Sequence, residues 1–272
     1  MRKQLWRILV LSLALVLCAC TGTGGAQSAV TLPTYEAPST QPAPTEATTT
    51  PATQEPETNA PAHSELYLPE YSTQQIIEYF EEIVLHMEYA DGEGNTALVQ
   101  KWNRPITYRI FGEPTEEDLA VLEALFDGLN EIPGFPGIYA VTEEYECNLR
   151  ISFLEPEAFT YEYSEFLQGE DAYGATRFWY YIDSNEIYTA TIGYRTDIDQ
   201  ATRTSILLEE IVNMLGTSDT VLREDSVVYQ YTNDNRALSN VDWLVLKLLY
   251  DPAIQCGMDA ERCRAVIQEL YY

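Results

Sequence analysis

The sequence predicts an α+β domain in which a small mixed or antiparallel sheet packs against several helices. Residues 148–154 and 177–182 alternate polar and apolar side chains, a pattern typical of half-buried strands. The C-terminal part instead repeats apolar residues at helical spacing, most clearly over residues 199–216. Because the helices gather after the strands and do not alternate regularly with them, this order favours the α+β class.

The first half of the domain contains three further signals. Residues 73–89 place apolar side chains on one helical face and acidic side chains on the other, which predicts an amphipathic helix packed on the domain. Residues 106–111 are expected to form a strand. Thr115, followed by Asp118 three residues later, has the pattern of a helix N-cap, so a helix should run from there to about Asn130.

The second half begins with a predicted hairpin. Residues 177–182 and 186–194 alternate like strands, and the turn-forming residues 183–185 separate them. The helix that follows should begin near Asp199 and end at Gly216, because glycine commonly terminates helices. The C-terminal part should be helical, with helices over residues 241–250, capped by Ser239, and over residues 259–270.

The N-terminus has the features of a bacterial export signal. Basic residues precede an apolar run at residues 8–17, which is shorter than the roughly 20 residues that a membrane-spanning helix needs. No later stretch is long enough to span a membrane. The tetrapeptide Leu-Cys-Ala-Cys ending at Cys20 resembles the lipobox of bacterial lipoproteins. This resemblance implies a signal peptide at residues 1–19 and a lipid attached to Cys20.

A spacer is expected between the lipid and the folded part. Residues 21–62 contain no Lys or Arg and hold seven of the 14 prolines, so they cannot bury enough apolar surface to fold. The predicted organisation is a lipidated Cys20 with a disordered Thr/Pro-rich spacer over residues 20–62, then one globular domain over residues 63–272. We expect the lipid on Cys20 to anchor the protein in the cell membrane on its extracytoplasmic face, at a Gram-positive cell surface.

The charge excludes one class of partner. The chain has 43 Asp and Glu against 15 Lys and Arg, a formal net charge of −28. Such a chain is repelled by nucleic acid, so no nucleic-acid partner is expected.

The cysteines past the lipobox are too few for a disulfide scaffold, since only Cys147, Cys256 and Cys263 remain. Cys256 and Cys263 are close enough in sequence to pair in an oxidising exterior. Cys147, beside an apolar run, is expected to be a small buried core residue.

One helix carries polar residues that bear on chemistry. Within residues 205–215, Ser205, Glu209 and Asn213 are four apart and fall on one narrow stripe, while most other positions are apolar. A helix with so much apolar surface is expected to be buried. Its polar stripe therefore needs hydrogen-bond partners, a cavity or a metal ion.

The spacing resembles the zinc-peptidase motif, in which two histidines one turn apart flank a glutamate and, in metzincins, a glycine and a third ligand follow. Residues 186–194 would then stand where a zincin has its edge strand. The alignment places Glu209 at the first ligand, Glu210 at the general base, Asn213 at the second ligand, Gly216 at the glycine and Asp219 at the third ligand.

The supply of histidine argues against zinc. The chain has only His63 and His86, both far in sequence from this helix, whereas a usual zinc site needs two or three converging imidazoles. Oxygen atoms of Glu209, Asn213 and Asp219 would instead suit Ca²⁺ or Mn²⁺. The alternative, which we prefer, is that no cofactor binds, that Glu209 and Glu210 face water or accept hydrogen bonds from the following loop, and that Asn213 caps a neighbouring element.

A closer resemblance rests on four segments, namely Trp102 to Ile110, Asn148 to Ile151, Glu209-Glu210 with Leu215-Gly216, and Leu248 to Pro252 leading to Gly257-Met258. These segments resemble the bacterial family called domain of unknown function 2927. Its members are mostly exported and look like relatives of metzincin peptidases, so the resemblance implies a zincin-like fold with a degenerate zinc-binding helix. Paired glutamates are common at this position in the family, and no activity is established that the resemblance would imply.

Two functions remain open. The first is a non-catalytic surface binding module, degenerate and metallopeptidase-like, whose partner is a cell-envelope protein or glycan. The second is a metal-dependent hydrolase or peptidase with oxygen ligands, in which Glu210 is the general base. Tyrosines between the middle strands suit binding to sugars or proteins, although tyrosines on strands are more often packed; they are Tyr161, Tyr163, Tyr173, Tyr180, Tyr181, Tyr188 and Tyr194.

Overall fold

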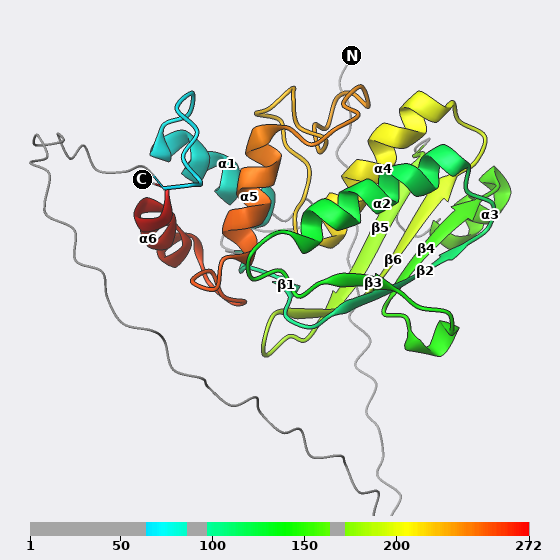
Figure 1. The fold of residues 1–272 in the computed structure, drawn as a ribbon, viewed down its shortest axis with the longest axis horizontal. Helices are drawn as coiled ribbons and strands as arrows, with labels where there is room; N and C mark the ends of the chain where they lie inside the picture. Colours follow the sequence, from blue (N-terminus) through cyan, green and yellow to red (C-terminus); the bar gives the residue numbers. More distant parts are fainter. Residues whose placement is uncertain (1–63, 86–96, 164–171, 272) are drawn as a thin grey trace, which may run out of the picture. The chain divides into compact units, whose positions relative to one another are not determined.

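In the computed structural model, the described residues form a fold centred on a mixed sheet of six strands (Figure 1). The structure describes residues 64–85, 97–163 and 172–271, all within the unit that spans residues 58–272. The predicted signal peptide, Cys20, the spacer and both histidines lie outside the described residues.

The strands pair mostly in parallel. From one edge the order is β3, β2, β4 and β6, all parallel, and β1 pairs in parallel with the first residues of β6. On its other side β6 pairs antiparallel with β5, which is the opposite edge of the described sheet. In chain order the strands are β1 (Lys101–Trp102), β2 (Ile106–Phe111), β3 (Ile138–Ala140), β4 (Leu149–Leu154), β5 (Gly174–Tyr180) and β6 (Glu186–Arg195).

Within residues 64–85, 97–163 and 172–271, six α-helices pack around this sheet. Helices α2 and α4 lie side by side along one face, while α1, α5 and α6 gather beyond the end of the sheet where β1 lies (Figure 1). Their bounds are α1 (Thr73–Leu85), α2 (Glu116–Asn130), α3 (Pro156–Tyr163), α4 (Gln200–Met214), α5 (Asn240–Tyr250) and α6 (Ala260–Leu270), with a 3₁₀ turn at Glu144–Glu146.

The two faces of the sheet differ in character. On the face toward α2 and α4, apolar residues of β4 lie in register with apolar residues of β6, for example Ile151 opposite Ile192 and Phe153 opposite Tyr194. These pairs are buried in the main core. Because successive strand residues point to opposite faces, the residues between them are on the other face, where α3 covers one end and the ring of Tyr163 packs on Gly193.

Local capping chemistry explains where the helices begin. The hydroxyl of Thr115 accepts from the backbone N–H of Asp118, and the Asp118 carboxylate accepts from the backbone N–H of Thr115, which is the predicted capping box of α2. Ser239 caps α5 in the same way, and Asp199 caps α4. Each of these caps depends on residues close in sequence.

Gly216 ends α4 as predicted. Its backbone has φ +106°, a conformation that residues with a Cβ rarely adopt, and a Cβ there would lie 1.9 Å from the carbonyl oxygen of Gln100. The position therefore requires glycine on two independent grounds.

The α+β class, with a mixed sheet packed against several helices and a helical C-terminal part, is confirmed. The hairpin is also confirmed, as β5 and β6. The placement of residues 186–194 at the sheet edge is wrong: β6 lies between β4 and β5, and the edge strand is β5. The first predicted helix is described as far as Leu85.

The cysteines depart from expectation. Cys147 is half-buried and its thiol donates to the carbonyl of Glu144 at 3.1 Å, so it is not the core residue predicted. Cys256 and Cys263 are both free thiols, and the core position of Cys263 in α6 keeps it from solvent. Among the described helices, none is both long and apolar enough to cross a membrane.

Candidate functional site

Helix α4 carries the residues that the sequence singled out, and most of its surface is buried. Ser205 is buried, while Glu209 and Asn213, one and two turns later, are half-buried. Glu210 is more buried than its neighbour Glu209, with 8% of its surface exposed. The polar stripe therefore lies at the margin of the core.

Glu210 packs against the edge strand β5. A Cβ added at Gly174 would lie 2.7 Å from Oε1 of Glu210, so the carboxylate sits directly against the backbone of this strand. The hydroxyl of Thr176 donates to the backbone carbonyl of Glu210 at 3.0 Å. A general base must lie within hydrogen-bonding reach of the water or substrate that it deprotonates. Here β5 occupies space immediately beside the carboxylate.

Asn213 and Asp219, which the zinc-peptidase alignment places at the second and third ligand positions, are in contact. Nδ2 of Asn213 donates to Oδ1 of Asp219 at 3.0 Å. Burial raises the pKa of Asp219 because it disfavours the charged carboxylate, and the hydrogen bond from Asn213 partly opposes this rise. The pair thus consists of one amide donor and one desolvated carboxyl group.

The loop after α4 is held against the C-terminal end of α1. The backbone N–H of Ser218 donates to the carbonyl of Ile83 at 2.7 Å. The carboxylate of Glu82 accepts from the hydroxyl of Thr220 and from the backbone N–H of Val221. Glu82 could not be singled out from the sequence, because it is 138 residues from Thr220 and resembles any acidic residue on the polar face of α1.

No group of three or more His, Cys, Asp or Glu side chains gathers as a metal-binding cluster in residues 64–85, 97–163 and 172–271. The hydrogen bond between Asn213 and Asp219 directs the amide N–H of Asn213, and not its oxygen, toward Asp219. A cation between these residues would need oxygen atoms of both to face it.

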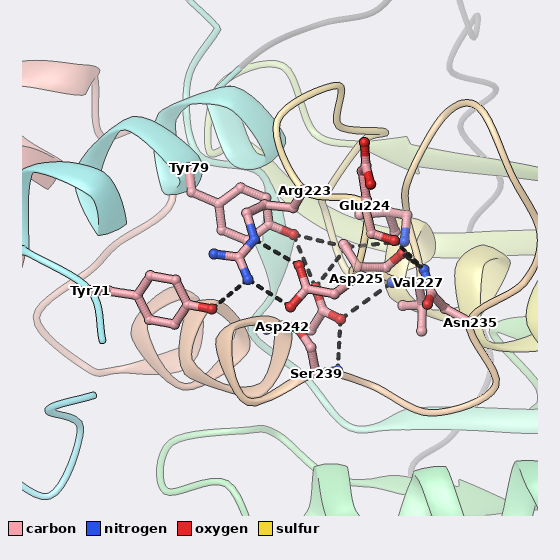
Figure 2. A network of polar contacts seen from close by, with 11 residues as sticks. Tyr71, Tyr79, Arg223, Glu224, Asp225, Val227, Asn235, Ser239 and Asp242 are labelled. Carbon is pink, nitrogen blue, oxygen red and sulfur yellow. Dashed lines mark hydrogen bonds and ion pairs between the residues drawn. The ribbon is translucent and has the colours of Figure 1, made fainter. Parts of the chain in front are cut away.

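A second polar network holds the same loop to α5 (Figure 2). Asp242, on the first turn of α5, is 3% exposed. Its Oδ1 accepts from the hydroxyls of Tyr79 at 3.0 Å and Ser226 at 2.7 Å. Its Oδ2 accepts from the backbone N–H groups of Ser239 at 2.9 Å and Val227 at 3.3 Å. One buried carboxylate therefore joins α1, the loop and α5.

Arg223 lies at the outer side of this network (Figure 2). Its guanidinium pairs with Asp225, donates to the hydroxyl of Tyr71, and lies 4.5 Å from the centroid of the Tyr71 ring. These contacts line a cavity of about 190 Å³ between α1 and the loop. Because the guanidinium is already bound to a carboxylate, the cavity has little capacity for a further anion.

A second cavity, of about 470 Å³, lies beside the end of α5 and includes Lys101 and Cys256 in its lining. Burial lowers the pKa of Lys101, and its ammonium group donates to the carbonyls of Leu249 and Ile254. Carbonyls at a helix C-terminus have no partner within the helix, so Lys101 acts as a cap. Neither of these two cavities is lined by residues of α4.

Fold and site together define a mixed α/β domain organised around one buried helix that carries carboxyl and amide groups. In a comparison with models of known families, residues 73–269 match the family described as protein of unknown function (DUF2927). Because the match covers most of the chain, the chain belongs to this family. A comparison with curated proteins found no match.

Segments that carried the family resemblance form hydrogen bonds to the C-terminal end of α4. The indole N–H of Trp102 donates to the carbonyl of Met214 at 2.9 Å, and the hydroxyl of Tyr250 donates to the carbonyl of Leu215 at 3.1 Å. Backbone hydrogen bonds join Val99 to Gly257 and Met258. Two of the four segments therefore secure the C-terminal end of α4.

Proposed function

We propose that the protein is a membrane-anchored extracytoplasmic lipoprotein, lipidated at Cys20, whose domain is a non-catalytic binding module. Its shape is that of a metallopeptidase relative that has a degenerate metal-binding helix. The partner is a component of the cell envelope.

The observation that carries the non-catalytic proposal is the hydrogen bond from Asn213 to Asp219. In the zinc-peptidase alignment these residues take the second and third ligand positions. In this protein one is an amide that directs its N–H at the other, at 3.0 Å. Two groups that satisfy each other are a stable structural pair, since buried polar groups need partners.

Two features support the zincin-like component of the proposal. The antiparallel edge strand β5 runs beside α4, and the Thr176 hydroxyl bonds to the Glu210 backbone. In this proposal β5, and not residues 186–194, corresponds to the edge strand of a zincin. The glycine of the motif is matched by Gly216 at the end of α4.

A metal-dependent hydrolase is the second candidate, and the burial of Asp219 favours it. A cation beside Asp219 would stabilise the ionised carboxylate that burial disfavours. In this candidate Ca²⁺ or Mn²⁺ binds Glu209, Asn213 and Asp219, and Glu210 activates water.

Elemental analysis of the purified protein, paired with peptidase assays, separates the two candidates. The wild type is compared with Glu210→Gln and with Glu157→Gln, an exposed glutamate on α3. A non-catalytic module has no stoichiometric metal, and all three proteins are inactive. Stoichiometric Ca²⁺ or Mn²⁺, with activity that Glu210→Gln abolishes and Glu157→Gln retains, would establish the hydrolase instead.

The anchor is tested by labelling cells with a fatty acid and separating their membranes. Cys20→Ser should lose the label and leave the membrane fraction, whereas Cys18→Ser, the neighbouring cysteine, should keep both. Equal labelling of the two variants would refute the assignment of Cys20.

A further inference from the structure

The sheet face turned away from α2 and α4 carries a row of arginines that crosses four strands. Arg109 of β2 lies in register with Arg150 of β4, Arg150 with Thr191 of β6, and Thr191 with Arg177 of β5. Arg195 is on the same face further along β6, where it pairs with Asp197 at 2.7 Å. Arg177 is held by α3, since it donates to the carbonyl of Glu162 at 3.1 Å and lies 4.8 Å from the centroid of the Tyr163 ring. Arg109 and Arg150 are therefore the two arginines that bear on ligand binding. The residues of this face include no Asp or Glu on these four strands; they are Thr107, Arg109, Phe111, Arg150, Ser152, Leu154, Ala175, Arg177, Trp179, Thr189, Thr191, Gly193 and Arg195.

The first two arginines form an unfavourable pair within the protein. Their guanidinium groups both lie against the ring of Phe111, at 5.1 Å for Arg109 and 3.8 Å for Arg150. Like charges directly opposite each other on neighbouring strands are destabilising. An anion bound between them would remove this repulsion and accept charge-assisted hydrogen bonds from both.

The carboxylates supplied by the protein neutralise this pair only in part. Arg150 pairs with Glu144 at 3.0 Å, but Glu144 is exposed, and such surface ion pairs contribute little and are easily exchanged. Arg109 has no ion-pair partner within the described part of the chain. In a protein with 43 acidic residues against 15 basic ones, a half-buried arginine without a carboxylate is a specific feature that calls for an external anion.

Aromatic rings and hydroxyls border the row. Tyr139 lies in register with Thr107 at one edge of the sheet, and Trp179 with Thr189 at the other edge. Tyr139 is 55% exposed and Trp179 is 42% exposed. Such rings present a flat apolar surface together with a polar tip, which suits the faces and hydroxyls of sugar rings.

We propose that this arginine face binds an extended anionic glycan, with its carboxylates on Arg109 and Arg150 and its sugar rings on Tyr139 and Trp179. The inference rests on the proposed binding-module function and names its ligand class. Neighbouring strands are about 4.8 Å apart, so the distance from β3, which carries Tyr139, across β2, β4 and β6 to β5, which carries Trp179, is roughly 19 Å, or several sugar units. An acidic peptide is less well matched, because extended peptides usually add to a sheet edge and this row crosses the strands.

The overall negative charge does not prevent such binding. At physiological salt the Debye length is about 8 Å, so charges elsewhere on the molecule are largely screened at this face. The arginines themselves contact the ligand directly. Affinity should therefore fall as salt rises, because several charge pairs form on binding.

Polygalacturonate is the probe, with dextran as the neutral polymer and polyglutamate as the acidic peptide, each titrated into the full protein by calorimetry. The variants are Arg109→Gln, Arg150→Gln and Trp179→Ala, with Arg262→Gln, an exposed arginine of α6, as the control. Each variant is accepted only if its circular dichroism and melting temperature match the wild type.

The wild type should bind polygalacturonate but not dextran. Each of the three face variants should weaken this binding about tenfold or more, and Arg262→Gln should change it less than twofold. Absence of polygalacturonate binding would overturn the proposal. Equal affinity for polyglutamate, with no effect of Trp179→Ala, would overturn the glycan in favour of simple charge attraction.

Measuring the length of the polygalacturonate after incubation with the protein tests this proposal and the proposed function independently. Binding with cleavage of polygalacturonate would retain the arginine face and refute the non-catalytic module. Absence of binding in a metal-free, inactive protein would refute the arginine face and retain the non-catalytic module.

Discussion

Nε of Arg203 donates to Oδ1 of Asp118 at 3.0 Å, with both side chains almost fully buried. Asp118 also belongs to the capping box of α2, and Arg203 lies in the first turn of α4. The amide of Gln200 donates to the same oxygen at 2.6 Å. One carboxylate therefore ties together the first turns of the two helices that cover the sheet.

Loss of this carboxylate should be costly. Asp118→Ala leaves the guanidinium of Arg203 buried without its partner, so we expect the free energy of unfolding to fall by roughly 3–5 kcal/mol. Urea unfolding followed by circular dichroism measures this. Glu117→Ala, an exposed change in the same turn, should stay within about 0.5 kcal/mol of the wild type. Equal stability of the two variants would contradict the role of the buried pair.

Comparing Gly216 with Gly257 separates two effects on stability, the cost of a positive φ and the cost of a steric clash. Gly216→Ala adds a Cβ that would lie 1.9 Å from the carbonyl oxygen of Gln100, at φ +106°. Gly257→Ala imposes a similar φ of +78°, but the nearest atom is 3.3 Å away. We expect Gly216→Ala to lower the free energy of unfolding by roughly 2 kcal/mol more than Gly257→Ala, because the first also displaces backbone. Thermal and urea unfolding of both variants tests the difference.

Asp219 predicts a pH dependence with a definite sign. Its pKa is raised above its ordinary value in the folded state, mainly by burial, so the folded protein holds this proton to higher pH than the unfolded chain does. The stability from this group is present below the ordinary pKa and is lost as pH rises through the raised one. The variant Asp219→Asn does not show this loss of stability, because an asparagine side chain does not titrate. As pH rises from below the ordinary pKa of an aspartate through the raised pKa of Asp219, the wild type should therefore lose stability relative to the variant.

Urea unfolding at a series of pH values measures this relative stability. Parallel profiles for the two proteins would contradict the role of Asp219. Millimolar CaCl₂ is a useful second condition, because a ligand that binds only the folded state stabilises it. In the hydrolase candidate Ca²⁺ raises the melting temperature of the wild type but not of Asp219→Asn, whereas the binding module shows no such difference.

The starts of the helices could be predicted from the sequence, because the residues that determine them are local. Thr115 with Asp118, and Ser239 with Asp242, are three residues apart, so their caps could be predicted from the pattern alone. The contact between Asn213 and Asp219 is also local, since a helical turn and a short loop separate them, but the sequence pattern predicted these residues as ligands of a cation, or Asn213 as the cap of a neighbouring element.

The parallel pairing of β2 with β4 could not be predicted in this way. The register of Arg109 with Arg150 joins residues 41 positions apart, and no local pattern specifies it. Two further strands were missed because β1 and β3 are only two and three residues long. The arginine face is a consequence of that register, so it was invisible until the strands were placed.

Tyr79 supplies the last prediction, since its hydroxyl reaches 163 residues along the chain to Asp242. Burial and the nearby carboxylate raise the pKa of Tyr79 strongly, so it remains a hydrogen-bond donor at any pH where the protein is folded. Tyr79→Phe removes one donor from a buried carboxylate, and we expect about 1–3 kcal/mol of destabilisation.

The loop should also loosen, because Asp242 holds the backbone N–H of Val227. Hydrogen exchange should therefore quicken at Val227 and Val228 while the amides of β4 stay protected. Tyr145→Phe, at an 83% exposed tyrosine, should leave both regions unchanged, and uniform quickening across β4 in Tyr79→Phe would show global destabilisation instead of a local tie.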